Sequence, residues 1–302
     1  PTTYTGRGIK VAVLDTGSAP QNPQCLGVVG YSACSTDPHP LDGHGHGSWC
    51  LNAATGRVAQ GLFGEVQGVA PEAGQIPIKV LHGVLGFGMT ADILAGIDRA
   101  VKLGARVISM SLGGDTCEGG CYEEDGGPCP DCKVITQLSR QGILFAIAAG
   151  NSGPDEWTIG CPGCAPGAIS VVSVSLTDFP RIAYWSSRGP SNKENQGKTY
   201  EPKPDVAAPG GGRAVSGAKP DEVIYSGEEG FMKGLYSGIK LDIADCMHGT
   251  SQACPHVAGL LAVLLEAGKI QSADDFKAIC AKMGHPQTIE DGFGVPKLSW
   301  FQ

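Results

Sequence analysis

Three polar residues of this sequence have the types and the order that acyl-transfer chemistry requires. Asp15 follows the apolar run VAVL, His46 lies in DGHGHGSWC, and Ser251 opens the apolar segment SQACPHVAGLLAVLLEAG. A serine hydroxyl is too weakly acidic to attack an amide unaided, so it needs a neighbouring base that a carboxylate orients. Each residue alone has a plainer explanation, Asp15 as a turn residue and Ser251 as a helix N-cap. Together they predict an Asp-His-Ser triad.

The segments that must position these residues alternate between strand-like and helix-like patterns. Val- and Ile-rich runs without alternating polarity indicate buried parallel strands at 9–15, 76–81, 106–112, 143–151 and 168–175. Helices are expected at 90–104, with Thr90 as N-cap, at 131–142, and after Ser251, with Pro255 in the first turn. This alternation predicts an α/β fold, a doubly wound, mostly parallel sheet with helices on both faces.

Length and composition narrow the classes of protein. A chain of 302 residues with no evident linker is expected to form one domain over 1–302, interrupted by insertions at 115–132 and about 213–246. The net charge of −8 argues against nucleic acid as a partner, because phosphate binding needs clustered Lys and Arg. No apolar run reaches the roughly 18 residues of a membrane span. The start at Pro1 rather than Met indicates a processed or excised product.

Twelve cysteines, an even number, favour an oxidising compartment and a secreted protein, with a cytoplasmic location as the alternative. Four of them share the first insertion with six acidic residues and no basic one; they are Cys117, Cys121, Cys129 and Cys132. Disulfides, a four-thiolate zinc site and free thiols all stay open there, although zinc sites more often show two CxxC pairs. The separate CPGC at 161–164 is expected to be a local disulfide staple, with a redox motif as the alternative. His44 and His46 lack a third metal ligand nearby, so no metal residue is assigned.

The triad residues and their surroundings resemble the subtilase (subtilisin-like) family of serine endopeptidases. The resemblance rests on HGS at His46 and GTSxAxPHVAG at Ser251, and it is supported by VISMSLGG, AAGNSG, SSRGP and KPDVAAPG. It extends from YTGRGIKVAVLDTG to DGFGVPKL, nearly the whole chain. The resemblance implies a subtilisin-like fold and an enzyme that hydrolyses peptide bonds through an acyl-enzyme.

The resemblance also implies roles for individual residues. Ser251 would be the nucleophile, His46 rather than His44 the general base, and Asp15 the group that orients His46. Asn151 would form the oxyanion hole with the Ser251 backbone N–H. The implied substrate-binding residues are the edge segment Ser111, Leu112 and Gly113 and the pocket walls Ala149, Gly150, Thr158, Ile159 and Gly160. Catalysis would need no cofactor, and a structural Ca²⁺ is compatible with the oxygen-rich loops but cannot be located.

Three residues depart from the family pattern. Trp49 stands where a second histidine is usual, and Cys50 matches a cysteine of the proteinase K branch close to the catalytic histidine. Cys254 replaces a small residue; as a nucleophile it is disfavoured, because it would lie a turn inside the helix that Ser251 heads.

Two other functions use the same residues. A peptide transpeptidase or macrocyclase would resolve the same acyl-enzyme with an amine, and a silent module would bind peptides without cleaving them. The partners expected for the endopeptidase are a polypeptide substrate and its own propeptide as inhibitor, with the chain as a monomer, no nucleic acid and no membrane span.

Overall fold

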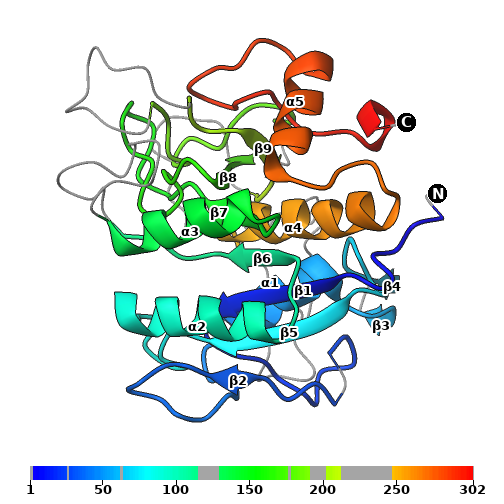
Figure 1. The fold of residues 1–302 in the computed structure, drawn as a ribbon, viewed down its shortest axis with the longest axis vertical. Coiled ribbons are helices and arrows are strands. Elements are labelled where there is room, and N and C mark those ends of the chain that lie inside the picture. Colours follow the sequence, from blue (N-terminus) through cyan, green and yellow to red (C-terminus); the bar gives the residue numbers. More distant parts are fainter. Residues whose placement is uncertain are drawn as a thin grey trace. The chain divides into compact units, whose positions relative to one another are not determined.

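The computed structural model describes residues 3–25, 27–61, 64–114, 129–175, 178–190, 202–211 and 247–301. These residues form two compact units, each with strands and helices (Figure 1). The first contains the described parts of Pro1–Met110 with Pro255–Lys269, and the second those of Ser111–Glu229 with Met247–Cys254 and Ile270–Gln302. The second predicted insertion and most of the first lie outside the described residues. A single domain over 1–302 therefore stays a prediction.

The first unit is built on four parallel strands in the order β2, β5, β1, β6. Their bounds are Tyr31–Ser32, Gly74–Lys79, Lys10–Asp15 and Val107–Met110, in that order. Helices α1 (His46–Thr55) and α2 (Thr90–Lys102) both pack against β1 and β5. In Figure 1, α2 lies in front of β5 and α1 lies behind β1, so the two helices cover opposite faces. A short antiparallel hairpin, β3 (Ala59–Gly61) with β4 (Gly64–Val66), completes this unit.

Strand β1 is the centre of the first unit because it pairs with a strand on each side. Its residues Val11–Asp15 are all buried, which explains the uninterrupted apolar run that ends in a carboxylate. The backbone of α2 comes close to this sheet at Gly96, where an added Cβ would lie 2.3 Å from Val80 Cγ1. Asp15 is thereby fixed at the carboxyl end of a rigid, covered strand.

The second unit is built on three parallel strands in the order β7, β8, β9. Their bounds are Leu144–Ala148, Ala168–Val174 and Val206–Pro209. Helix α3 (Pro130–Arg140) packs on β7 and β8, and α5 (Ala273–Met283) packs on the 3₁₀-helix η2 (Leu298–Phe301). Helix α4 (Thr250–Glu266) contributes its first residues to the second unit and the rest to the first.

The predicted strands and helices are found with shifts of a few residues at their ends. The expected N-cap of α2 is wrong by one position, because Met89 is the extended N-cap residue and Thr90 already lies in the helix. The expected place of Pro255 is also wrong. It is the sixth residue of α4 rather than part of its first turn, and so removes an N–H from inside the helix.

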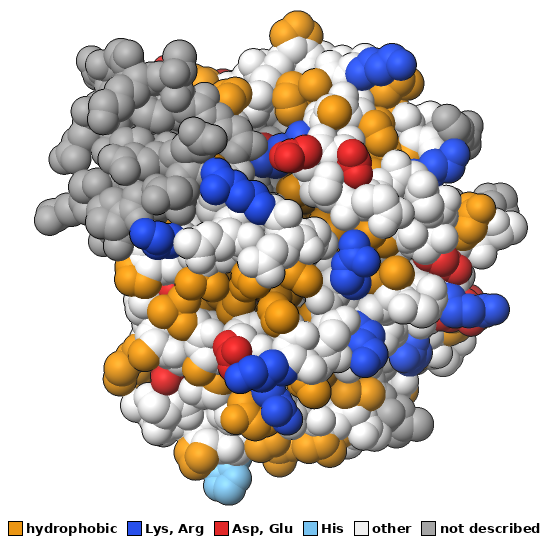
Figure 2. All heavy atoms as spheres, in the orientation of Figure 1, with side chains coloured by type: hydrophobic (Ala, Val, Ile, Leu, Met, Phe, Trp, Pro, Cys, Tyr) orange, Lys and Arg blue, Asp and Glu red, His pale blue; other side chains and the backbone are white. Residues whose placement is uncertain are grey.

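No helix among the described residues is long and apolar enough to cross a membrane. Figure 2 shows Lys and Arg side chains spread over the viewed face, with Asp and Glu among them.

A buried ion cluster in the second unit generates a stability prediction. The Asp205 carboxylate lies 2.8 Å from Lys203 Nζ and 3.4 Å from Lys277 Nζ, and it accepts a hydrogen bond from the Ser170 backbone N–H at 2.7 Å. Burial alone would raise the pKa of Asp205, but the charges of the two lysines outweigh it and lower that pKa.

We expect Lys203→Met to lower the free energy of unfolding by roughly 3–5 kcal/mol, because it leaves a buried carboxylate without its nearest cation. Lys102→Met is the matched control, since its ion pair with Asp98 is exposed and should contribute less than about 1 kcal/mol. Guanidinium titration of each variant measures both values. The difference between Lys203→Met and the unchanged chain should shrink as pH falls through the lowered pKa of Asp205. Equal losses in the two variants would contradict the prediction.

Candidate active site

Asp15 and His46 form a hydrogen-bonded pair in the first unit. His46 is the first residue of α1, and its Nδ1 lies 2.7 Å and 2.9 Å from the two carboxylate oxygens of Asp15. An ionised carboxylate only accepts hydrogen bonds, so Nδ1–H is the donor, and Nε2 of the neutral ring is left with its lone pair. The Asp15 side chain is 1% exposed and that of His46 is 20% exposed. A buried acid therefore orients a solvent-accessible base.

A second buried carboxylate, that of Asp42, holds the start of α1 in place. Its Oδ1 accepts hydrogen bonds from the backbone N–H groups of His44 and Gly45 at 2.9 Å and 2.8 Å. Its Oδ2 accepts from the Ser48 backbone N–H at 2.8 Å and from the Ser48 hydroxyl at 2.7 Å. The first turn of a helix has N–H groups without intrahelical acceptors. Asp42 accepts that of Ser48 together with those of the two residues before the helix, at an end where negative charge is favoured.

Thr16 connects this cap to strand β1. Its hydroxyl donates to Asp42 Oδ1 at 2.9 Å and accepts from the Gly47 backbone N–H at 2.9 Å. Gly47 has no room for a side chain, because an added Cβ would lie 2.5 Å from the Gly17 carbonyl oxygen. The helix that carries His46 is therefore held against the strand end that carries Asp15.

The Asp15 carboxylate stabilises positive charge on the His46 ring. Burial opposes the charge on the ring, but Asp15, with a smaller contribution from Cys50, outweighs it and raises the pKa of His46 well above the usual 6.5. Cys50 lies one turn along α1, with its Sγ 3.9 Å from His46 Nδ1. The Trp49 side chain is fully buried and meets the His256 ring edge-on.

Ser251 lies in the first turn of α4 and exchanges two hydrogen bonds with Ser111 in the second unit. The Ser251 hydroxyl donates to the Ser111 carbonyl at 3.3 Å, and the Ser111 hydroxyl donates to the Ser251 carbonyl at 2.8 Å. The Ser251 carbonyl lacks its usual donor four residues on, because residue 255 is a proline without an N–H. Ser111 supplies a replacement and so fixes the turn that carries Ser251.

Thr250 fixes the amide of Asn151 in the same unit. Asn151 Oδ1 accepts from the Thr250 backbone N–H at 2.9 Å and from its hydroxyl at 3.0 Å. The Thr250 hydroxyl in turn accepts from the Gly150 backbone N–H at 3.2 Å. With Oδ1 engaged twice, the Asn151 Nδ2 donors point away from Thr250, and Asn151 is exposed.

The segments predicted to bind substrate meet one another in the second unit. The Gly160 N–H donates to the Ala149 carbonyl, and the Gly114 N–H donates to the Cys161 carbonyl, both at 2.9 Å. An added Cβ at Gly160 would lie 2.4 Å from the Gly114 carbonyl oxygen, so only glycine fits there. Gly114, which follows the edge segment Ser111–Gly113, is therefore hydrogen-bonded to Cys161, which follows Thr158–Gly160. Ile159 is fully buried in the structure.

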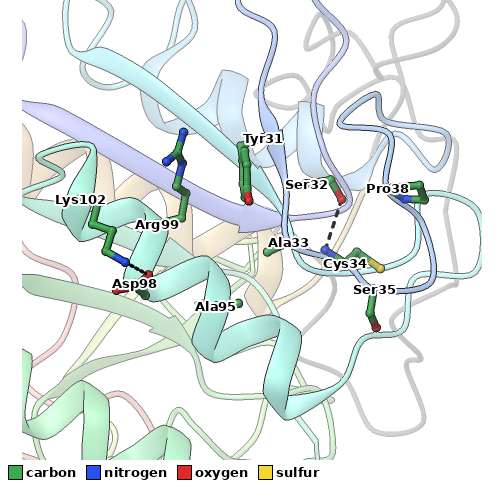
Figure 3. A pocket seen from close by; sticks show the side chains of 10 residues that line it. All are labelled: Tyr31, Ser32, Ala33, Cys34, Ser35, Pro38, Ala95, Asp98, Arg99 and Lys102. Atoms are coloured by element: carbon green, nitrogen blue, oxygen red, sulfur yellow. Dashed lines mark hydrogen bonds and ion pairs between the residues drawn. The ribbon is translucent and has the colours of Figure 1, made fainter.

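Other sequence candidates have ordinary places in the fold. The Cys254 thiol is buried and donates to the Ala146 carbonyl at 3.1 Å, which does not suit a nucleophile. A pocket of 480 Å³ in the first unit contains none of the predicted site residues (Figure 3). Its wall includes Arg99, stacked 4.6 Å from the centre of the Tyr31 ring, and the Asp98–Lys102 ion pair.

The sequence reasoning missed the residues that position the reacting groups. Asp42, Thr16 and Thr250 each lie within four residues of a predicted triad member, and Asp42 is the first residue of the DGHGHGSWC motif. A polar residue just before a helix is a known capping signal and could have found Asp42. The bond between Thr250 and Asn151 joins residues 99 positions apart, so no local pattern encodes it.

The sequence profile of the subtilase family, peptidase S8, matches residues 6–294. The chain therefore belongs to the subtilase family, as the resemblance of its motifs predicted.

Individual relatives agree with this assignment. The chain is 33% identical to serine protease AprX of Bacillus subtilis strain 168, over 92% of this chain and 61% of AprX. It is 29% identical to thermitase of Thermoactinomyces vulgaris, over 90% of this chain and 80% of thermitase. Among solved structures, sphericase matches with a TM-score of 0.71 and 26% identity, covering 98% of this chain and 94% of sphericase. The predicted α/β, subtilisin-like fold is thus confirmed.

The chain spans only part of several relatives, including 18% of pyrolysin of Pyrococcus furiosus and 61% of AprX.

The Asp15–His46 pair generates a prediction on titration. We expect NMR titration of the imidazole to give His46 a pKa above 6.5, and Asp15→Asn to lower it, because the ring loses its counter-charge. A raised pKa stabilises the fold below the unfolded value near 6.5, and this contribution is lost as pH rises through the folded pKa. Asp98→Asn, an exposed site on α2, is the control and should leave the titration unchanged. A His46 pKa at or below 6.5 in the unchanged chain would contradict the prediction.

Proposed function

We propose that the protein hydrolyses peptide bonds through an acyl-enzyme on Ser251, with His46 as general base and Asp15 as the group that orients it. The observation that carries the proposal is the 2.7 Å bond from His46 Nδ1 to Asp15, which leaves Nε2 as the proton acceptor. Nε2 takes the hydroxyl proton as Ser251 Oγ attacks the carbonyl carbon, and it then gives that proton to the leaving amine. Water attacks the acyl-enzyme in the same way and restores Ser251.

Asn151 Nδ2 and the Ser251 backbone N–H are the proposed donors to the oxyanion of the tetrahedral intermediate. This role is supported by the two hydrogen bonds from Thr250, which hold the Asn151 oxygen away and present the NH₂ group. Donors fixed in advance need no reorganisation when negative charge develops, which is the main source of their effect. The position of Ser251 in the first turn of a helix adds a favourable field for that charge.

The proposed substrate is an extended polypeptide that adds a strand along Ser111, Leu112 and Gly113. Gly113 is exposed and accessible for such pairing. The residue before the scissile bond would lie against Ala149–Gly150 and the backbone of Thr158–Gly160. The protein's own propeptide could occupy the same groove as an inhibitor, and the active chain would be a monomer.

Cys50 is proposed to correspond to the cysteine of the proteinase K branch. Its thiol is buried one turn from His46, in contact with Nδ1 and on the helix face that carries the base. Secretion stays a prediction, as do disulfides elsewhere in the chain and a structural calcium ion without assigned ligands. The local disulfide expected between Cys161 and Cys164 is not formed in the structure.

The nucleophile is tested by covalent labelling. We expect a serine-directed fluorophosphonate to label the unchanged chain once and Ser251→Ala not at all, with hydrolysis of a peptide library lowered by roughly six orders of magnitude. Cys280→Ala, at a buried cysteine of α5 outside the predicted site, is the control and should retain labelling. Intact mass must first show that no propeptide is bound. Failure of the folded, unchanged chain to react, or products joined into rings with loss of one water, would overturn the proposal.

The oxyanion hole gives a separate kinetic prediction. Asn151→Leu should lower kcat by about 100- to 1000-fold with little change in KM, because the amide acts on the transition state more than on bound substrate. Ser152→Ala, at the next position, is the matched control and should keep kcat within a few-fold. Steady-state rates on one peptide substrate measure both. A loss expressed only in KM would contradict the assignment.

A further inference from the structure

Two cysteine pairs that are distant in sequence meet in the second unit. Cys129 and Cys132 form the CPDC motif at the end of the first predicted insertion, and Cys161 and Cys164 form the CPGC motif. The Sγ of Cys161 lies 3.4 Å from that of Cys129 and 3.4 Å from that of Cys132. The Sγ of Cys164 lies 4.0 Å from that of Cys132. All four side chains are at most 8% exposed.

These distances match metal coordination and do not match disulfide bonds. Four sulfurs bound to one zinc ion at about 2.3 Å in a tetrahedron are separated by about 3.8 Å. A disulfide brings two sulfurs to about 2.05 Å. The Sγ atoms of Cys129, Cys132 and Cys161 all lie within 4.8 Å of one another, which a single ion can bridge. We propose that Cys129, Cys132, Cys161 and Cys164 bind one structural zinc ion as a four-thiolate site.

The arrangement has the composition expected of such a site. Two CxxC pairs are the usual ligand spacing of structural four-cysteine zinc sites, and soft thiolates in a closed, buried set select zinc over harder cations. The predicted set of Cys117, Cys121, Cys129 and Cys132 had only one such pair. Its first two members lie outside the described residues, and the second pair comes instead from the CPGC motif.

Helix α3 supplies an environment that favours thiolates. Cys129 is its N-cap and Cys132 lies in its first turn, with Pro130 between them. The backbone N–H groups of this turn lack intrahelical acceptors and face the start of the helix, where negative charge is stabilised. Zinc binding releases the four thiol protons and leaves a net charge of −2 on the cluster, whose thiolate sulfurs can accept hydrogen bonds from these N–H groups.

Backbone hydrogen bonds connect the cysteine cluster to the segments that are proposed to bind substrate. The carbonyl of Cys161 accepts the Gly114 N–H, and Gly160, the preceding residue, donates to Ala149. An added Cβ at Gly163 would lie 2.7 Å from the Ala148 carbonyl oxygen, so the CPGC turn is pressed against the end of β7. A zinc ion would therefore link α3 to the proposed substrate pocket. The expectation that zinc removal changes KM rests on the proposed function.

Metal analysis of the full chain, purified under reducing conditions without added chelator, tests the site. We expect one zinc per chain, lost in Cys132→Ser and in Cys164→Ser and retained in Cys280→Ser, a buried cysteine of α5 outside the cluster. If the first two variants fail to fold, Co²⁺ added to the unchanged, metal-stripped chain should give the intense visible bands of a tetrahedral thiolate site. Zinc removal should also lower the melting temperature and raise KM.

Several results would overturn the inference. Stoichiometric iron in place of zinc would be one, and a chain that neither contains metal nor gives cobalt bands would be another. A third would be resistance of the four cysteines to alkylation in the denatured, unreduced chain, because this result would indicate disulfides. Fluorophosphonate labelling of the same samples separates the two proposals. Zinc without labelling would refute the catalytic assignment alone, whereas labelling of a zinc-free, unchanged chain would refute the metal site alone.

Discussion

The hydrogen bonds of the buried Asp42 carboxylate are the constraint on which the geometry of the base depends. A histidine at the first position of a helix sits where positive charge is disfavoured, and the glycine before it has the left-handed φ of 96°. Asp42 offsets both effects. It accepts the N–H groups of Gly45 and Ser48 and, through Thr16, ties that turn to the end of β1. Asp15 can then lie 2.7 Å from the imidazole without any freedom of the ring to swing away.

Ser251, the proposed nucleophile, is also held by a side chain, but here the side chain donates to a helix carbonyl instead of accepting from helix N–H groups. Pro255 deprives the Ser251 carbonyl of its helical donor, and the Ser111 hydroxyl replaces it. Thr250, one residue earlier, orients Asn151. The Ser251 carbonyl of α4 thus accepts from Ser111, which follows β6, and the Gly47 N–H of α1 donates to Thr16, which follows β1. The proposed reacting and substrate-binding residues consequently depend on side chains that pair with backbone groups lacking a helical partner.

The sequence predicted the strands, the main helices and the residues of the pair Asp15–His46, because buried strands and family motifs leave strong local patterns. It misplaced Thr90 and Pro255 by a few positions, since helix ends depend on cap geometry rather than on periodicity. It did not find Asp42 or Thr250 as positioning residues. It also separated the CPDC and CPGC motifs, because their meeting depends on how α3 packs on β7 and β8 and not on any spacing along the chain.

The contacts of Cys161 have a consequence for how this chain can be lengthened. The Gly114 N–H donates to the Cys161 carbonyl, and the Cys129 sulfur lies against the Cys161 sulfur. The residues on either side of the 14 positions between them are therefore both held by Cys161. Closing a loop between fixed anchors costs little more when the loop is longer, about 0.6 kcal/mol for each doubling. A change in chain length between residues 114 and 129 would therefore leave these two anchor points, and the Cys161 turn that they hold, in place.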